Sequence, residues 1–594
     1  MSAIITHRFR KNNVQNIFDE MTLPKVMIAG CGSIGTTVTS SSLTIPANLQ
    51  IGMAVTTVSG TGILSTLSTI VTSVSTNSFQ IFPAPTTSLS GATLSFYSQY
   101  YIGIGKSDPY KGFDGSDASP ASPVAAVKTE VDVRSNLIAL QKVTVALNAG
   151  SAASIGAIYG NAGYVLPRYN WASGTYFKAY DSSDPSCYYP STLPNGSLAY
   201  PCYAVWNSGS GDRLYICAQS GIDSSSQQTV TSQPHQGATV IGTVATALAD
   251  SYRWTYVSDL GLDTGATLTA KGLSASSGNT SSTLDSNQFF KIYRRATTTG
   301  SSALITAPTS SAGAIYSCRV VSGGAGYTTA STFLIKGDGT SAAGRVTSIG
   351  LGGVIVSVDM TANGSGYTTG AVEFVAGLGT TTAIIIPRIA PQNGFGYDVT
   401  SDLPAYYAGF YANFAYDAVY PGTADVPSTD QIRQVSLIRN PVVFASTSGS
   451  TITYRCLKSL VINTTSTTDL PDFGDVIHQT GGGAGELARG YVDIVKIGAS
   501  SATVYYHQNS STFGSAGLNI TPIPFGTGAY KIYRKSDYTS PGFTPTGTSP
   551  PTITSATSSE EYVAGTGEVV YLQNRVPITQ APGQTETLTI VTQF

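Results

Sequence analysis

Short runs of β-branched residues, closed off by glycine, proline, asparagine or serine, recur along almost the whole chain, as in TTVTSSSLTIPANLQIGMAVTTVSG (36–60). Valine, isoleucine and threonine favour extended backbone, whereas glycine, proline and asparagine favour tight turns. The pattern predicts many short strands joined by turns. At 594 residues the chain is long enough to bury more than one core. We therefore expect a mainly β protein with an antiparallel β-sandwich core, small inserted β domains and a few short helices.

Helix signals are few. Residues 8–21 place Phe9, Ile17 and Phe18 on compatible faces of a helix, and Pro24 would end it. A second helix is expected to begin at Ser122-Pro123, with serine as the N-cap and proline at the first helical position, and to run to about Leu140.

Charged residues make up only 11% of the chain, against roughly 25% in an average soluble protein. Polar but uncharged surfaces pack against neighbours without burying unpaired charges, which suits a component of an assembly and equally a secreted adhesin. The net charge of −2 provides no general attraction to nucleic acids or anionic membranes, so neither is expected as a partner. The basic segments Lys291–Arg295 and Lys531–Lys535 alternate charged and apolar residues, as half-buried strands do.

Three regions differ from the rest of the chain. Residues 24–97 contain no Asp or Glu, and residues 446–560 are rich in serine, threonine and glycine. Between them, Gly324-Ala-Gly-Tyr-Thr-Thr329 recurs as Gly364-Ser-Gly-Tyr-Thr-Thr369, with a degenerate third copy at Gly394–Tyr397. Each Gly-x-Gly-Tyr would turn the chain tightly and place an aromatic ring on the next strand. We expect 24–97 to be a small β domain, 300–390 a repeat β module and 446–560 a further β insertion.

Two glycine-rich motifs resemble nucleotide-binding loops but lack what that chemistry needs. Gly30–Gly35 matches GxGxxG after an apolar run, yet β-branched residues and a proline follow where a helix must face the pyrophosphate. In Gly103-Ile-Gly-Lys-Ser107, Tyr100 occupies the position of the first glycine of a phosphate-binding loop. Neither motif predicts a bound nucleotide.

The sequence also offers no convincing catalytic or metal-binding pattern. The paired acids Asp181/Asp184 and Glu560/Glu561 lie in polar loop contexts, and no GxSxG motif occurs. The six cysteines (31, 187, 202, 217, 318 and 456) form no CxxC pair and are expected to be buried thiols; three of them are evenly spaced, but no histidine lies near them. We expect no enzyme, no cofactor and no metal site, although the acid pair of a polysaccharide depolymerase could come from distant strands.

Several short segments, in order from end to end, resemble the baseplate wedge subunit of T-even-like contractile-tailed phages, the homodimer-forming gene product eight type. They include GKSDPY (105–110), VLPRYNWASGTYFKAYD (165–181), RQVSLI (433–438) and the closing segment 565–594. The motif residues are Phe9, Arg10, Gly105, Lys106, Ser107, Pro109, Pro167, Arg168, Trp171, Tyr252, Trp254, Arg433, Gln434, Asn440, Pro441, Glu568, Tyr571, Asn574, Arg575, Pro577, Gln584 and Glu586.

The matched segments cover 1–23, 98–299, 391–445 and 561–594, and they define a discontinuous core interrupted by the three unusual regions. The sequence departs from the family at Ser251, where the family prefers glycine, at Gln573, where it often has an acid, and at Tyr110, where tryptophan is usual. Read as residues alone, the tryptophans should fill the core with their polar tips bonded at an edge. For Arg168 and Arg575, a buried hydrogen-bond fork and an exposed charge remain open.

The resemblance implies a non-enzymatic structural protein of the virion tail baseplate, assembled in the cytoplasm of the host bacterium. Its implied partners are a second copy of itself and other wedge proteins, with which it takes part in baseplate assembly and in the rearrangement before sheath contraction. We expect the insertions to contact neighbouring wedges, tail fibres or the host surface. The alternative is a receptor- or glycan-binding tail fibre or adhesin, which the serine, threonine, glycine and tyrosine content and the repeats favour.

Overall fold

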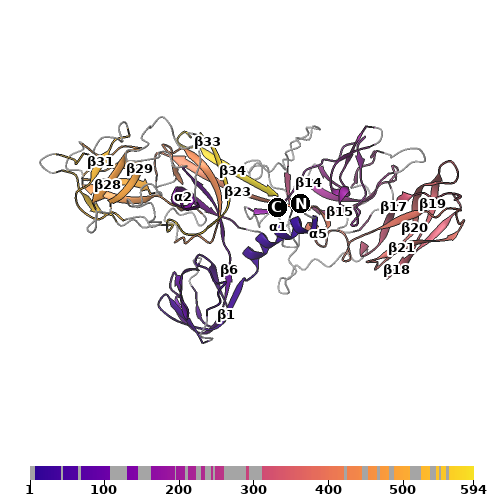
Figure 1. The fold of residues 1–594 in the computed structure, drawn as a ribbon, viewed down its shortest axis with the longest axis horizontal. Helices are drawn as coiled ribbons and strands as arrows, with labels where there is room; N and C mark the ends of the chain where they lie inside the picture. Colours follow the sequence, from indigo (N-terminus) through magenta and orange to yellow (C-terminus); the bar gives the residue numbers. More distant parts are fainter. Residues whose placement is uncertain are drawn as a thin grey trace, which may run out of the picture. The chain divides into compact units, whose positions relative to one another are not determined.

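The structure is a computed structural model of the chain (Figure 1). It describes residues 7–41, 45–64, 69–106, 130–144, 162–193, 196–207, 212–221, 229–234, 243–244, 248–259, 289–292, 311–420, 424–444, 453–463, 469–480, 487–508, 524–535, 543–546, 550–556, 561–578 and 580–593. With 54% strand and 7% helix, and with many antiparallel sheets, it confirms the expected mainly β class. Among the described residues, no helix has both the length and the apolarity needed to cross a membrane.

The chain divides into two compact units. Unit 1 comprises Met1–Asn16, Val145–Gly409 and Thr589–Phe594, and unit 2 comprises Ile17–Thr144 and Phe410–Leu588.

Of the two predicted helices, the structure confirms the first. Helix α1 (His7–Thr22) ends two residues before Pro24, with Val14 and Phe18 buried. The second prediction was wrong over 137–140, because α2 spans only Glu130–Ser135 and Leu137–Lys142 is a strand, β8, with five of its six residues buried. Strand neighbours on both sides of β8 give its backbone hydrogen-bond partners, and this tertiary pairing overrides the local signal. Residues 122–129 lie outside the described part of the chain.

Six strands near the N-terminus close into a small barrel within unit 2. In barrel order they are β1 (Val26–Ile34), β2 (Thr37–Ser40), β5 (Ser78–Phe82), β4 (Thr69–Val74), β3 (Ala54–Ile63) and β6 (Thr87–Tyr97). Apolar side chains from these strands form its buried core, among them Phe79 and Phe96 packed edge to face. The first five residues of the GxGxxG segment lie within strand β1, which ends at Ile34, and its last glycine, Gly35, lies in the turn that follows.

Unit 2 also contains a five-stranded sheet and a six-stranded sheet. The first has the order β26 (Thr453–Arg455), β8, β7 (Tyr100–Gly105), β25 (Ile432–Arg439) and β33 (Glu568–Ile578). The second has the order β31 (Lys531–Tyr533), β28 (Val476–Thr480), β29 (Leu487–Ile497), β30 (Ser501–His507), β27 (Lys458–Asn463) and β32 (Ile553–Ser555). Gly103 and Gly105 of the second glycine motif thus lie on strand β7. Strands β23 (Tyr407–Asp417) and β34 (Thr585–Gln593) pair with each other, and β24 (Val426–Pro427) pairs with β23.

Unit 1 is built from short strands around an aromatic cluster, and from the repeat module. The short strands are β9 (Ala162–Pro167), β10 (Tyr176–Phe177), β11 (Ser191–Thr192), β12 (Leu198–Tyr200), β13 (Tyr203–Asn207), β14 (Asp212–Gln219), β15 (Arg253–Asp259) and β16 (Phe289–Ile292), with the 3₁₀ helix η1 (Pro185–Tyr188) and α5 (Val399–Asp402). The repeat module contains β17 (Ile315–Ser322), β18 (Thr332–Gly337), β19 (Thr340–Ile349), β20 (Ile355–Ser365), β21 (Gly370–Ala376) and β22 (Ile384–Ile389).

All three Gly-x-Gly turns have the backbone that the sequence predicted. Both glycines of each copy have a positive φ, between 59° and 83°, a region that glycine adopts without the penalty other residues meet. The tyrosines of the first two copies, Tyr327 and Tyr367, are buried in the module core. They precede strands β18 and β21, so the prediction that each ring lies on the next strand was wrong.

Candidate functional site: charged clusters between the sheets

Residues that lie far apart in the sequence become cross-strand neighbours in the five-stranded sheet. Gly105 on β7 is the register partner of Gln434 on β25, and Gln434 is in turn the partner of Asn574 on β33. Gln434 is fully buried and donates to the Val133 carbonyl at 2.9 Å. An added Cβ at Gly105 would overlap the Gln434 amide and the Asn136 carbonyl, so only glycine fits there. Three predicted motif segments thus meet at one line across the sheet.

Next to this line lies a buried set of charges, the Lys106 cluster, formed by Lys106, Asp430, Asp493 and His507. Lys106 directly follows β7. Its ammonium lies 2.6 Å from Asp430 Oδ1 and pairs with the Asp493 carboxylate. His507 Nδ1 lies 2.8 Å from the other Asp493 oxygen. Both aspartate side chains are completely buried and that of Lys106 is 11% exposed. Because Asp493 is on β29 and His507 on β30, the cluster joins the five-stranded sheet to the six-stranded sheet.

The two aspartates of the cluster have pKa values shifted in opposite directions. Burial by itself would raise the pKa of Asp493, but His507 and Lys106 lower it to about 2. Burial and the Asp493 charge raise the pKa of Asp430 well above its usual value, and Lys106 only partly opposes them. Burial alone would lower the pKa of Lys106, yet the two carboxylates raise it. One ammonium therefore neutralises one carboxylate, and the second carboxyl favours its protonated form.

The Arg439 cluster, formed by Glu20, Lys25, Arg439 and Glu568, lies between α1, the start of β1 and the five-stranded sheet. Arg439 Nη1 is 3.1 Å from Glu20 Oε2, and the same guanidinium pairs with Glu568. Lys25 lies 3.1 Å from Glu20 Oε1. Burial would lower the pKa of Arg439, but Glu568, Tyr100 and Glu20 raise it.

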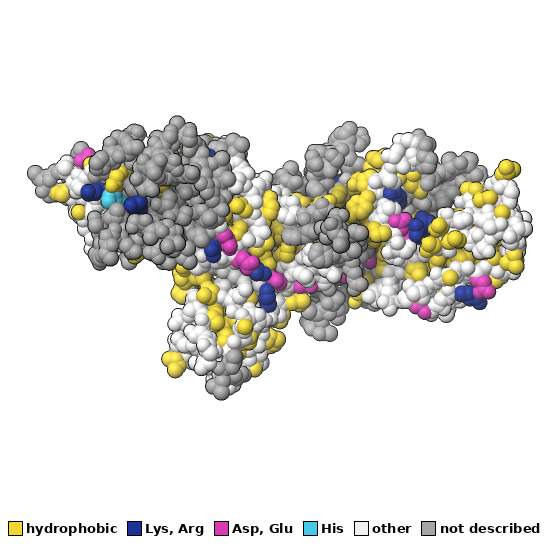
Figure 2. Space-filling model, in the orientation of Figure 1, with side chains coloured by type: hydrophobic (Ala, Val, Ile, Leu, Met, Phe, Trp, Pro, Cys, Tyr) yellow, Lys and Arg dark blue, Asp and Glu magenta, His cyan; other side chains and the backbone are white. Residues whose placement is uncertain are grey.

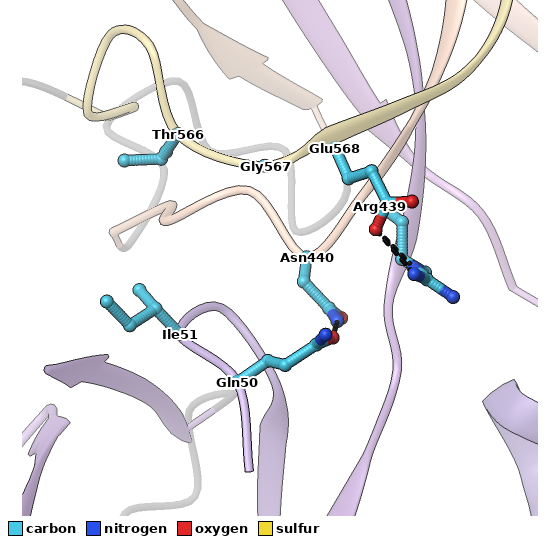
Figure 3. A pocket seen from close by; sticks show the side chains of 7 residues that line it. All are labelled: Gln50, Ile51, Arg439, Asn440, Thr566, Gly567 and Glu568. Atoms are coloured by element: carbon cyan, nitrogen blue, oxygen red, sulfur yellow. Dashed lines mark hydrogen bonds and ion pairs between the residues drawn. The ribbon is translucent and has the colours of Figure 1, made fainter. Parts of the chain in front are cut away.

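A pocket of about 250 Å³ opens beside the Arg439 cluster (Figure 3). Its lining residues are Gln50, Ile51, Arg439, Asn440, Thr566, Gly567 and Glu568. Asn440 has a left-handed backbone (φ 52°), accepts the Gln99 N–H at 2.8 Å and donates to Gln50 Oε1 at 3.1 Å. Gln99 in turn donates to the Gly52 carbonyl at 2.9 Å. These bonds join the barrel to the sheet through uncharged amides, and Arg439 already has two acidic partners.

In unit 1 the Asp181 cluster joins the repeat module to the loop before η1. Arg319 on β17 and Arg388 on β22 both direct their Nε atoms to Asp181 Oδ2, at 3.2 and 3.3 Å. Asp181 is buried, and Arg319 also reaches Asp184 at 3.2 Å. Thus the acids Asp181 and Asp184, considered in the sequence as a catalytic pair, are here held by two arginines. On the face of the molecule shown in Figure 2, basic side chains likewise lie next to acidic ones in a few groups.

The predicted aromatic residues form the core of unit 1. Trp254 is completely buried, stacks on Tyr252 (ring centroids 5.9 Å apart, interplanar angle 12°) and meets Phe177 edge-on at 5.4 Å. Trp171 packs against the edge of this cluster. The Tyr252 hydroxyl accepts the Phe177 N–H at 3.2 Å, as expected of a satisfied polar tip. The indole N–H groups of Trp171 and Trp254, in contrast, have no hydrogen-bond partner among the described residues, so that expectation fails for both tryptophans.

Both arginines left open by the sequence have polar partners. Arg168 is buried and donates from Nε to Asn170 Oδ1 at 2.7 Å, and the Pro167 carbonyl accepts the Tyr203 hydroxyl at 2.9 Å. Arg575 on β33 pairs with Glu586 on β34, and Glu586 also accepts the Tyr416 hydroxyl at 2.9 Å. Neither arginine is therefore an exposed charge, and the hydrogen-bonded alternative describes both better.

The remaining predicted motif residues do not form a single site. Phe9 and Arg10 belong to α1; Arg433, Tyr571 and Pro577 lie on strands β25 and β33; and Pro441 follows Asn440. Gln584 accepts the Ala581 N–H at 2.8 Å in the turn before β34. Ser107 and Pro109 lie outside the described residues.

At Ser251, where the sequence departs from the family, the backbone is left-handed (φ 63°). Residues other than glycine adopt this conformation at a cost of about 1–2 kcal/mol. The glycine that the resemblance implies would therefore fit this backbone better than the serine present.

All six cysteines are buried free thiols, as predicted. The even spacing of Cys187, Cys202 and Cys217 reflects their alignment on adjacent backbone segments, since the N–H of each later cysteine donates to the carbonyl of the one before at 2.8 Å. Within the described ranges, no group of three or more His, Cys, Asp or Glu residues has an arrangement suited to a metal ion.

No sequence pattern predicted that Asp430, Asp493, His507, Arg319 or Arg388 would belong to charged clusters. A signal was present for Asp493, which is the single charge in the apolar run Tyr491-Val-Asp-Ile-Val495. An isolated acid within a buried strand requires a partner, although the sequence does not identify it.

No protein-family model matches this chain, and no curated protein sequence matches it.

Proposed function

We propose that the chain is a non-enzymatic structural component of the baseplate wedge of a contractile phage tail, acting as a homodimer that links other wedge proteins. In this role it holds neighbouring subunits in register during baseplate assembly and takes part in the rearrangement before sheath contraction.

The observation that carries the proposal is the convergence of the motif segments. Gly105, Gln434 and Asn574 come from three separate segments and are consecutive cross-strand neighbours. Chance matches to a family would have no reason to become neighbours in space, whereas residues that define a common core must do so. The convergence supports the resemblance without any catalytic argument.

The left-handed backbone at Ser251 is a second, independent support. The family preference for glycine at this position came from the resemblance alone, and a φ of 63° is what such a preference requires.

The charged clusters suit a protein that transmits force between its neighbours in an assembly. Replacing a buried ion cluster by apolar residues often costs no stability, but its geometry permits only one arrangement of the parts that it joins. In a chain with 11% charged residues, the Lys106, Arg439 and Asp181 clusters each join separate parts of one unit. Fixed relative positions are what a protein that transmits force between neighbours needs.

The direct test is co-expression of this chain with the other tail proteins of the same phage, followed by light scattering and negative-stain imaging. The expected result is a complex containing two copies of this chain that appears at the tip of assembled tails. Binding to a glycan array by a chain that joins no tail complex would instead support the receptor-binding adhesin. A loss of viscosity in polysaccharide solutions would support an enzyme.

A further inference from the structure

The repeat module (residues 311–390) has an internal two-fold relationship. The first strand of each repeat pairs with the last strand of the other, because β17 pairs with β22 and β20 pairs with β19. The middle strands β18 and β21 pair antiparallel across the axis. The Tyr327 hydroxyl accepts the Ala383 N–H at 3.0 Å, and the Tyr367 hydroxyl accepts the Ala342 N–H at 3.3 Å.

Each end of the module is formed around one Gly-x-Gly-Tyr turn in the same way. At one end, Gly366 and Tyr367 donate their N–H groups to the carbonyls of Ala312 and Gly313, at 3.0 and 3.1 Å. At the other end, Gly326 and Tyr327 donate to the carbonyls of Gly352 and Gly353, at 2.9 and 3.0 Å. Each residue that forms one end therefore has a counterpart at the other end, forty positions away in the sequence.

The end around Tyr367 is covered by the chain itself. The Ser311 hydroxyl accepts the Phe395 N–H at 3.1 Å, Gly313 donates to the Pro391 carbonyl at 3.1 Å, and the Tyr316 ring lies 6.5 Å from that of Phe395. Phe395 belongs to the third, degenerate repeat turn, Gly394–Tyr397, and Pro391 lies three residues before that turn. As a result Ser311, Ala314 and Tyr316 are buried.

The end around Tyr327 has no such cover among the described residues. The positions forty residues after Ser311, Ala314 and Tyr316 are Leu351, Val354 and Val356, and all three are exposed, Leu351 completely. At the covered end, Asp338 caps the turn by accepting the N–H groups of Thr368 and Thr369. The position forty residues later is Leu378, which is 71% exposed. We call this end the apolar tip, consisting of Val321, Leu351, Val354, Val356, Leu378 and Ile384.

We propose that the apolar tip is a self-association surface, which binds the same tip of a second copy of this chain about a two-fold axis. The turns that carry these side chains meet around Tyr327, since Ala325 pairs with Thr381 and Gly326 donates to the Gly352 carbonyl. Exposed apolar side chains gathered at one place on a soluble protein usually mark an interaction site. The six side chains carry no charge, so two identical tips meet without like-charge repulsion, as an isologous contact requires. Moreover, at the covered end the third repeat turn, Gly394–Tyr397, packs on Ser311 and Tyr316 of the repeat module within a single chain.

Other classes of partner fit this surface less well. Aliphatic side chains offer no hydrogen bonds to a sugar, and the tip supplies no basic residue for anionic lipid headgroups. The proposed contact rests on the proposed function in one respect: the expected homodimer would have the apolar tip as one of its interfaces.

The test is sedimentation velocity of the full-length chain across a range of concentrations, with the double variant Leu351→Asp/Leu378→Asp. Both residues lie in exposed turns, so the variant should fold, and its association should be lost or at least tenfold weaker. The matched control is Leu334→Asp, at a half-exposed leucine on β18 outside the tip, which should associate like the unmodified chain.

A second measurement identifies the contact directly. Leu351→Cys should form a disulfide-linked dimer under mild oxidation, and Leu334→Cys should not; the native cysteines are all buried and give a low background. A tip variant that associates like the unmodified chain, or an unmodified chain that stays monomeric throughout, would overturn the proposal. The proposed function is tested separately, by whether two copies of the chain enter a complex with the other tail proteins on co-expression.

Discussion

Lys106 and Asp493 are 387 positions apart in the sequence, yet their side chains form an ion pair in the interior of unit 2. Lys106 was singled out in the sequence as part of a motif, whereas Asp493 stands in a region without any matched motif. The pair therefore ties the end of β7 in the five-stranded sheet to β29 in the six-stranded sheet, and its removal should reveal how strongly the two sheets depend on each other.

The variant Lys106→Met should destabilise unit 2 by about 3–5 kcal/mol, because it leaves the buried Asp493 carboxylate without its ammonium partner. The measurement is urea unfolding followed by circular dichroism. All three tryptophans (171, 206 and 254) belong to unit 1, so the tryptophan fluorescence transition of unit 1 serves as an internal reference. Lys336→Met, which removes an exposed pair with Glu373, should cost less than about 1 kcal/mol. Equal effects of the two variants would contradict the burial argument.

The six-stranded sheet should lose stability in mild acid through His478. Burial, with Arg489 and Lys531 nearby, lowers the pKa of His478 from 6.5 to about 4. The unfolded chain then binds a proton that the folded chain does not, so this contribution is complete above pH 6.5 and is lost as the pH falls toward 4. His478→Gln should flatten the change in the urea midpoint of unit 2 between pH 7 and pH 4.5. An unchanged slope would show that His478 is not responsible.

Two glycines of the same turn should respond differently to alanine. Gly364 and Gly366 both have positive φ, but an added Cβ at Gly364 would overlap the Thr340 carbonyl, whereas at Gly366 it would meet open space. Gly366→Ala should cost only the backbone penalty of about 1–2 kcal/mol. Gly364→Ala should cost clearly more, measured as the loss of hydrogen-exchange protection across β19 and β20. A similar loss in both variants would mean that the close approach is relieved by small backbone shifts.

Ser251→Gly should stabilise unit 1. The left-handed backbone penalises serine by about 1–2 kcal/mol, and the greater freedom of glycine in the unfolded chain offsets part of this gain. A net gain of about 0.5–1 kcal/mol is expected in the unfolding transition reported by tryptophan fluorescence. Ser251→Ala is the control, because alanine keeps the backbone penalty and should give no gain.

The sequence by itself determined the local structure. The β-branched runs and turn residues specify strands of a few residues, and the Gly-x-Gly pairs specify turns with positive φ, because both depend on the preferences of each residue and its immediate neighbours. For the same reason the first helix could be predicted, and both glycine motifs could be rejected as nucleotide sites.

Only the tertiary structure decided which distant residues become partners. Leu137–Lys142 is a strand because β7 and β26 lie on either side of it, and Asp493 is tolerated in a buried strand because Lys106 and His507 reach it. Similarly, Ser311 is buried and its counterpart Leu351 is completely exposed, because only the end of the module around Ser311 is covered by the segment that contains the third repeat turn. Such pairings depend on strand order and on contacts between segments hundreds of residues apart, which no local pattern encodes.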